Sequence, residues 1–296
     1  MDEGQGAVDA TTAPEVAPTA VSATPEGAIP VGIVVADPQC AEGIELMRTG
    51  DVDKAIELLM QVAHADMSNA YALANLGHCY KLKGIISKEI EYYQKALEAK
   101  PDYLTALINL GTAYGRQDLW DREIELCQKA LEVKPDLNVA KNNLAYAYMG
   151  KEDYERASAL IQEILAADPY YIQAWVNLAF VYNAQGYHDQ AVECCTTVTK
   201  IDPNCIEAWN NMGFAYKNKD DAQQAIECYN RTVGINEKYA IGWSNLAFIY
   251  KDKGWYDYAI ESFKKVYRID AESDLGEQAL TALRGLGVSA AQLDNE

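Results

Sequence analysis

Two rows of side chains recur along the chain at a fixed interval of 34 residues, and both could contact another molecule. Asparagine recurs at six places: Asn75, Asn109, Asn143, Asn177, Asn211 and Asn245. Three residues after each asparagine follow, in turn, His78, Thr112, Tyr146, Phe180, Phe214 and Phe248. An asparagine amide offers the donors and the acceptor that complement a peptide bond, and aromatic rings accept apolar side chains. The two rows predict a groove that binds an extended peptide.

Charged residues on the same predicted face limit what the groove accepts. At the repeat positions that share this face, the basic residues are Lys81, Arg116, Lys217 and Lys251, and the acidic residues are Glu207 and Asp252. The ligand therefore need not be basic, although the chain as a whole has a net charge of −19. Two other interpretations stay open: the asparagines bond within their own hairpin or to water, and a neighbouring repeat partly covers the rings. Under the groove interpretation, replacing Asn177, Asn211 and Asn245 with alanine should preserve the fold.

Cysteine and histidine are the other candidates for chemistry. Cys194, Cys195, Cys205 and Cys228 lie near His188 in the sequence. Adjacent cysteines on a helix point about 100° apart, so they chelate one metal ion poorly. We interpret these cysteines as small buried hydrophobes and expect neither a metal nor a cofactor. The three histidines are isolated from any nucleophile motif, and no glycine-rich phosphate loop is present, so we expect no enzymatic activity.

The composition narrows the class of partner. A net charge of −19 disfavours nucleic acid and anionic membrane surfaces, both of which are bound mainly through Lys and Arg. No run of eighteen apolar residues predicts a membrane span. The sequence starts with two acids and no base, unlike a secretory signal, and seven cysteines without a C-x-x-C pair are typical of a reducing compartment. We expect a cytoplasmic protein that binds another protein.

The 34-residue interval also predicts the elements that position the two rows. Repeats begin at residues 36, 70, 104, 138, 172, 206 and 240, without an insertion. Glycine or alanine occupies position 8 of every repeat, tyrosine position 11 of the last six, and alanine position 20 of five. Small residues at positions 8 and 20 let two antiparallel helices approach closely, while large residues at positions 11 and 24 fill the adjoining space. Each repeat is therefore predicted to be a helical hairpin.

This pattern, over residues 36–273, resembles the tetratricopeptide repeat family. The resemblance implies an all-α fold, an α-solenoid in which seven hairpins form a right-handed superhelix and the first helices line its concave face. It places the asparagines on that face, in a row similar to the asparagine ladder of the repeat arm of O-linked N-acetylglucosamine transferase. Chaperone-tail binders of the family hold a carboxylate with lysine at position 5, and no repeat of this chain has lysine there.

Two departures from the pattern carry predictions of their own. Gln39 and Glu42 stand where apolar residues belong, which predicts a weak and partly exposed first repeat. Glu89 and Glu123 occupy the tight position 20. We expect each carboxylate to pair with a neighbouring Lys or Arg at the edge of its hairpin; the alternative is a loosened hinge.

The two ends of the chain differ from the repeats. Residues 1–35 contain no Lys, Arg or aromatic residue and are predicted to be a disordered leader. The apolar stretch 28–37, AIPVGIVVAD, is either a plain linker or a strand-like peptide that occupies a groove. At the other end, Leu275, Ala279 and Leu283 form a one-sided stripe that predicts a capping helix within residues 274–296.

The predicted function is that of a non-enzymatic adaptor or assembly factor that holds an extended client peptide in the concave groove. The residues expected to contact the peptide are the six asparagines, the rings of Tyr146, Phe180, Phe214 and Phe248, and the cations Lys217 and Lys251. The alternative is a homo-oligomeric scaffold, assembled when the leader of one chain fills the groove of another.

Overall fold

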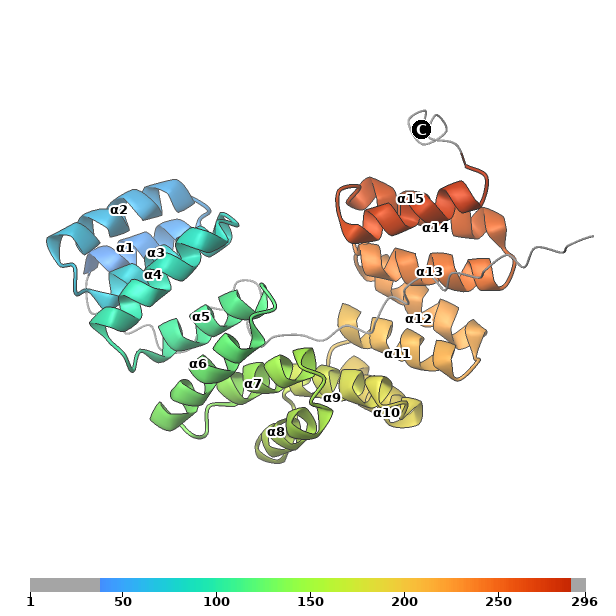
Figure 1. The fold of residues 1–296 in the computed structure, drawn as a ribbon, viewed down its shortest axis with the longest axis horizontal. Helices are drawn as coiled ribbons and strands as arrows, with labels where there is room; N and C mark the ends of the chain where they lie inside the picture. The colour runs from blue at the N-terminus through green and yellow to red at the C-terminus, as the bar shows by residue number, and fades with distance from the viewer. Residues whose placement is uncertain (1–37, 289–296) are drawn as a thin grey trace, which may run out of the picture. The chain divides into compact units, whose positions relative to one another are not determined.

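The computed structural model describes residues 38–288, which form fifteen α-helices (Figure 1). The first helices of the repeats are α1 (Pro38–Arg48), α3 (Ala70–Leu82), α5 (Leu104–Gly115), α7 (Asn138–Gly150), α9 (Ile172–Ala184), α11 (Ile206–Asn218) and α13 (Ala240–Asp252). The second helices are α2 (Val52–Ala65), α4 (Ile86–Ala99), α6 (Trp120–Val133), α8 (Tyr154–Ala167), α10 (His188–Ile201), α12 (Ala222–Ile235) and α14 (Tyr256–Ile269); α15 (Asp274–Gly285) follows them. The prediction of an all-α fold of tandem hairpins is confirmed. The leader, the stretch 28–37 and the last eight residues lie outside the described residues.

The turn inside every hairpin contains one left-handed residue. Position 15 has a positive φ in all seven repeats, at Gly50, Gly84, Asp118, Glu152, Gly186, Asp220 and Gly254. Glycine adopts this conformation without a steric penalty, whereas a side chain there costs roughly 1–2 kcal/mol. The repeat geometry therefore overrides local preference at Asp118, Glu152 and Asp220.

The chain divides into two compact units, and residues 38–181 belong to the N-terminal one. Its hairpins close because position 8 has little or no side chain. A Cβ atom on Gly77 would lie 2.9 Å from the ring of Tyr93, which is fully buried at position 24 of the same repeat. On α1, Glu42 is exposed, in agreement with the expectation of a partly exposed first repeat.

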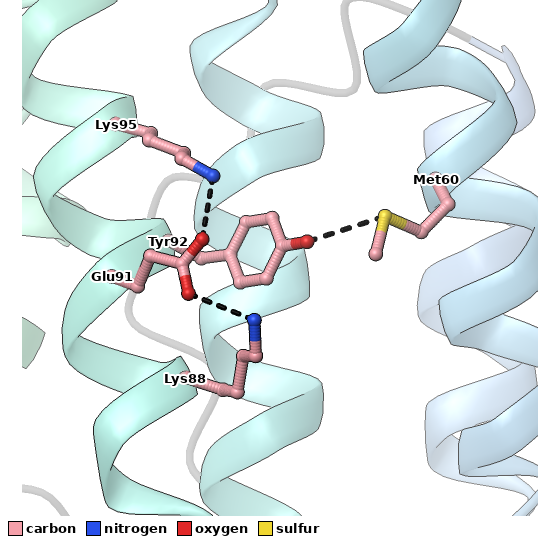
Figure 2. Close-up of polar contacts among 5 residues, drawn as sticks. All are labelled: Met60, Lys88, Glu91, Tyr92 and Lys95. Atoms are coloured by element: carbon pink, nitrogen blue, oxygen red, sulfur yellow. Dashed lines mark hydrogen bonds and ion pairs between the residues drawn. The ribbon is translucent and has the colours of Figure 1, made fainter.

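Polar contacts tie α4 to its surroundings (Figure 2). The Tyr92 hydroxyl donates to the Met60 sulfur of α2 at 3.3 Å, which links the second helices of repeats 1 and 2. On the outer face of α4, Glu91 accepts from Lys88 at 2.9 Å and from Lys95 at 2.6 Å. These two ion pairs are solvated and lie on one helix, so they support its helicity by only a few tenths of a kcal/mol each.

Residues 182–288 belong to the C-terminal unit, which uses the same packing. A Cβ atom on Gly213 would lie 2.6 Å from the ring of Tyr229, again a pair of positions 8 and 24. The Trp209 indole donates to the Pro203 carbonyl at 2.9 Å and so fixes the turn that precedes α11. After the last repeat, α15 buries Ala279 and Leu283, as the stripe predicted.

A charge pair joins the second helix of one repeat to the first helix of the next at alternate junctions. The pairs are Asp53–Lys83, Asp121–Lys151 and Asp189–Lys219, each between position 18 and position 14 of the following repeat. All three lysines are partly exposed and the aspartates are mostly exposed, so each pair is worth about 0–1 kcal/mol. These pairs link fixed positions of neighbouring repeats and contribute little to stability.

Candidate functional site

The asparagine row lies on the first helices, and all six side chains are buried. The exposed fraction is 7% for Asn75 and 5% for Asn109. The Asn75 amide donates to the Tyr71 carbonyl of its own helix at 2.9 Å. For Asn109, no described residue accepts or donates a hydrogen bond at the side chain. These two amides are the members of the row that are not bonded to another helix.

Further along the row the amides bond between neighbouring first helices. Asn143 donates to the Thr112 hydroxyl at 3.1 Å, which joins α7 to α5. Asn177 donates to the Asn142 side-chain oxygen at 3.1 Å, and Asn245 donates to that of Asn210 at 2.8 Å. The sequence places these asparagines opposite the stripe that packs within each hairpin, and the structure adds that they are buried against the neighbouring repeat. Their amides join consecutive repeats, because position 6 faces the first helix of the preceding repeat.

Sequence reasoning missed the polar partners of the row. Asn211 is fully buried, and its backbone carbonyl accepts a hydrogen bond from Asn183 at 3.0 Å. The Asn183 oxygen lies 3.2 Å from His188 Nδ1, so a three-residue polar chain links α9, α10 and α11 inside the C-terminal unit. The sequence does contain a pattern from which two of these bonds could have been predicted. Asn142 and Asn177 are 35 residues apart, and so are Asn210 and Asn245.

The aromatic row is half-covered, as one of the open interpretations held. Tyr146 packs edge-on against Trp120 of the preceding repeat, with ring centroids 5.8 Å apart. Phe214 meets His188 at 6.5 Å, and Phe248 meets Phe263 of its own hairpin at 5.1 Å. All of these row members, and Phe180 as well, remain partly exposed. The remaining surface of each ring is therefore available to a ligand.

The two predicted groove cations lie on neighbouring first helices. Lys217 lines a surface pocket of about 340 Å³ between the end of α11 and the end of α13. The other lining residues are Asn218, Asp220, Ala222, Ile249, Asp252 and Lys253. Lys251 is exposed on the last turn of α13. The pocket has two cations and two acids, so its walls suit a polar ligand group of either sign.

The two glutamates at position 20 have different environments. Glu89 is buried and binds Arg116 of the next repeat, so the predicted pairing is confirmed there. Burial nevertheless raises the pKa of Glu89, and Arg116 opposes that shift. Glu123 is fully buried, and neither of its carboxyl oxygens has a hydrogen-bond partner among the described residues. The prediction of a paired carboxylate is wrong for Glu123, and its burial raises the pKa to about 8.

The reason for the difference is the residue at position 13 of the following repeat. Glu89 pairs with Arg116, which stands at position 13 of the next repeat. For Glu123 the residue at that position is Gly150. A Cβ atom on Gly150 would lie 2.5 Å from the Trp120 ring, so an aromatic ring occupies the space of the missing cation. The Glu123 carboxyl sits instead against Gly115, where a Cβ atom would lie 2.2 Å from Oε2. At neutral pH this carboxyl is therefore mostly protonated.

The cysteines are buried thiols. All seven are free, and burial raises the pKa of Cys194, Cys205 and Cys228 to about 12. Thiols in this state are poor nucleophiles and poor metal ligands. Among residues 38–288, no three His, Cys, Asp or Glu side chains come together as metal ligands. Each helix in this part of the chain is too short or too polar to cross a bilayer.

Comparison with known proteins identifies the repeat. Family models described as tetratricopeptide repeat match residues 40–103 and 90–138, residues 148–213, and residues 206–239 and 240–273. No curated protein sequence matches the chain.

Similar solved structures support the fold. A tetratricopeptide repeat protein from Parabacteroides merdae ATCC 43184 is 16% identical, with a TM-score of 0.73 over 83% of this chain and 97% of that one. The Cut9–Hcn1 hetero-tetramer of APC/C gives 16% identity and a TM-score of 0.70 over 86% of this chain and 50% of the other. PilW, a type IV pilus biogenesis factor, is 21% identical, with a TM-score of 0.62 over 70% of this chain and 96% of that one. At these identities the likeness concerns the fold alone.

Proposed function

Because the chain belongs to the tetratricopeptide repeat family, whose members generally mediate protein–protein interactions and assembly, we propose that it is a non-enzymatic adaptor or assembly factor. It holds an extended segment of a client protein, in the cytoplasm, along the face formed by its first helices. The aromatic row takes apolar side chains of the client, and Lys217 and Lys251 take its polar or acidic groups.

One observation carries this proposal. Phe214 and Phe248 follow each other at the repeat interval and are each partly exposed, and Lys217, on the same helix as Phe214, lines a surface pocket. Rings that the fold needed only for packing would be fully covered, as Phe263 is. Partly exposed aromatic anchors beside a cation are the residues that dominate binding energy in protein interfaces.

The asparagines have two roles in this proposal. Asn143, Asn177, Asn211 and Asn245 hold the first helices in register and so preorganise the rings. Asn75 and Asn109 are the amides that reach the client backbone, since neither is bonded to another helix. The hydrogen bonds between first helices support this division of roles.

The proposal is tested by quantitative affinity capture from the native cell with a double variant, Phe214→Ser and Lys217→Glu. Clients bound along the first helices should be depleted at least tenfold relative to the unaltered chain, because two anchors are lost together. Tyr170→Ser is the matched control, since Tyr170 is the most exposed tyrosine and lies outside the row. Equal capture by both variants, with unchanged melting, would refute the proposal. Light scattering across a concentration series distinguishes a client from a second copy of the chain.

A further inference from the structure

The first residue of every second helix stands at position 17 of its repeat, and in repeats 3 and 5 it is a ring that packs on the next repeat. Trp120 meets Tyr146, at position 9 of repeat 4, with ring centroids 5.8 Å apart. The same indole fills the space beside Gly150 at position 13, where a Cβ atom would lie 2.5 Å from it. His188 meets Phe214 at 6.5 Å. A ring at position 17 therefore fills the space next to the following first helix.

Repeat 6 has the smallest residue at this position. The residues at position 17 are, in chain order, Val52, Ile86, Trp120, Tyr154, His188, Ala222 and Tyr256. A surface pocket of about 340 Å³ opens where repeat 6 meets repeat 7, and Ala222 is part of its lining. We call it the Ala222 pocket. The alanine leaves open a space of the kind that an indole fills after repeat 3.

The Ala222 pocket lies at the place of the missing ring. Its wall includes Asp252, at position 13 of repeat 7, which is the position of Gly150 beside Trp120. Ile249, at position 10 of the same helix, adds a buried apolar surface. The remaining lining residues belong to α11 and to the turns that follow α11 and α13, all within the C-terminal unit. The pocket is therefore a property of one junction between repeats.

The charges around the pocket do not favour an ion of either sign. Lys217 and Lys253 contribute two positive charges to the lining. Asp220 and Asp252 contribute two negative charges, so the four groups balance. Their carboxylates can accept a hydrogen bond from a tyrosine hydroxyl or an indole N–H. The rim therefore suits a neutral group with a polar edge.

The apolar and cationic parts of the lining suit a ring. Alanine and isoleucine side chains offer an apolar surface, and a lysine ammonium is attracted to the face of an aromatic ring. The chain already uses such contacts, since the Arg156 guanidinium lies 4.3 Å from the centroid of the Tyr148 ring. A volume of about 340 Å³ is at the small end of ligand pockets, which favours one side chain over a larger ligand.

We infer that the Ala222 pocket takes an aromatic side chain of the client, a tyrosine or a tryptophan. Its ring packs on Ala222 and Ile249 and replaces the ring that position 17 supplies after repeats 3 and 5. The inference rests on the proposed function, because the client segment that lies along the first helices supplies the ring. Lys217 connects the pocket with the aromatic row, since it lies one helical turn after Phe214 on α11.

The test fills the pocket with a side chain of the protein itself. Ala222→Trp places at position 17 the residue that repeat 3 has there, and Ala222→Ile places the residue of repeat 2, so the repeat accepts both. Gln223→Trp is the matched control, because it adds the same ring at the next residue, which is exposed and does not line the pocket. Thermal melting of the full chain checks that all three variants are folded.

A phage-displayed library of random peptides is then selected on the full chain. Peptides that bind the unaltered chain and Gln223→Trp but not Ala222→Trp should share a tyrosine or a tryptophan. For one such peptide, labelled with fluorescein, anisotropy should show at least tenfold weaker binding to Ala222→Trp and a smaller loss with Ala222→Ile. Alanine in place of the peptide's aromatic residue should weaken binding to the unaltered chain equally, and should add no loss with Ala222→Trp.

Three results would overturn the inference. The first is a set of selected peptides that share no aromatic residue. The second is equal peptide binding by Ala222→Trp and Gln223→Trp. The third is self-association of the unaltered chain that Ala222→Trp abolishes in light scattering, since a second copy would then be the occupant.

Affinity capture from the native cell separates the failure of this inference from the failure of the proposed function. Clients that are lost with the double variant Phe214→Ser and Lys217→Glu but kept by Ala222→Trp would refute the pocket and leave the adaptor function in place. Clients that are kept by both variants would refute the adaptor function itself.

Discussion

The buried Glu123 makes folding stability depend on pH in a way that one substitution should remove. The carboxyl has no counter-charge, and its folded-state pKa is about 8 against an ordinary value of 4.5. A folded state that holds a proton more tightly than the unfolded state loses stability as pH rises between the two values. The stabilisation is complete below about pH 4.5, falls by about 1.4 kcal/mol per pH unit, and is lost once pH exceeds about 8.

The expected magnitude at neutral pH follows directly. Between pH 4.5 and pH 7 the loss amounts to about 3 kcal/mol, a large fraction of the stability of an ordinary domain. Glu123→Gln keeps the shape of the protonated acid and has no titration. The variant should therefore be about 3 kcal/mol more stable than the unaltered chain at pH 7, and nearly equal to it at pH 4.5.

The assay is urea unfolding followed by circular dichroism at pH 5, 6, 7 and 8, with hydrogen exchange of the α6 peptide as the local readout. Two titratable groups interact with the carboxyl, Cys127 and Tyr146, and the charge of Glu123 contributes to the raised pKa of each. Glu125→Gln is the control, because Glu125 is exposed and pairs only with Lys129. Parallel pH curves for the unaltered chain and Glu123→Gln would refute a buried, unpaired carboxyl.

Three further substitutions test the packing. Gly213→Ala should lower the free energy of unfolding by about 1–2 kcal/mol in urea denaturation, because its Cβ would lie 2.6 Å from the Tyr229 ring; unchanged stability would show that the ring shifts freely. Glu152→Gly should raise stability by about 1 kcal/mol, since φ is +59° there, and a fall would contradict relief of backbone strain. Asn245→Ala should cost about 2 kcal/mol because Asn210 loses a buried donor, and a neutral thermal melt would count against this bond as a link between repeats.

Much of the fold follows from the period because each structural position is sampled seven times. The pairing of a small residue at position 8 with a large one at position 24 is visible in the sequence and appears in the structure as Gly77 on Tyr93 and Gly213 on Tyr229. The pairing of Glu89 also followed from the sequence, since a buried acid needs a cation.

The burial of the asparagines did not follow from the sequence, and the cause is geometrical. A helical wheel divides one helix into a packed side and an open side. A first helix in a tandem array packs on two sides, against its own second helix and against the neighbouring repeats. Position 6 lies on the side away from the second helix of its own repeat, but it faces the neighbouring repeat. The hydrogen bond from Asn177 to Asn142 is an example. The lack of a cation beside Glu123 could have been predicted from the sequence. Position 13 of the following repeat is Arg116 for Glu89 but Gly150 for Glu123.

The alternation of the charge pairs has a consequence for which hairpins can be neighbours. Position 18 is aspartate in repeats 1, 3, 5 and 7, and position 14 is lysine in repeats 2, 4, 6 and 7 but glutamine in repeats 3 and 5. Repeats 4 and 6 also share an asparagine pair, at Asn142 and Asn210, and an aspartate that caps the second helix, Asp153 and Asp221. Because the charge pair returns every 68 residues in repeats 1 to 6, removing repeat 2 or repeat 4 alone would place an aspartate at position 18 beside a glutamine, whereas removing repeats 2 and 3, or repeats 4 and 5, would restore an aspartate–lysine neighbour.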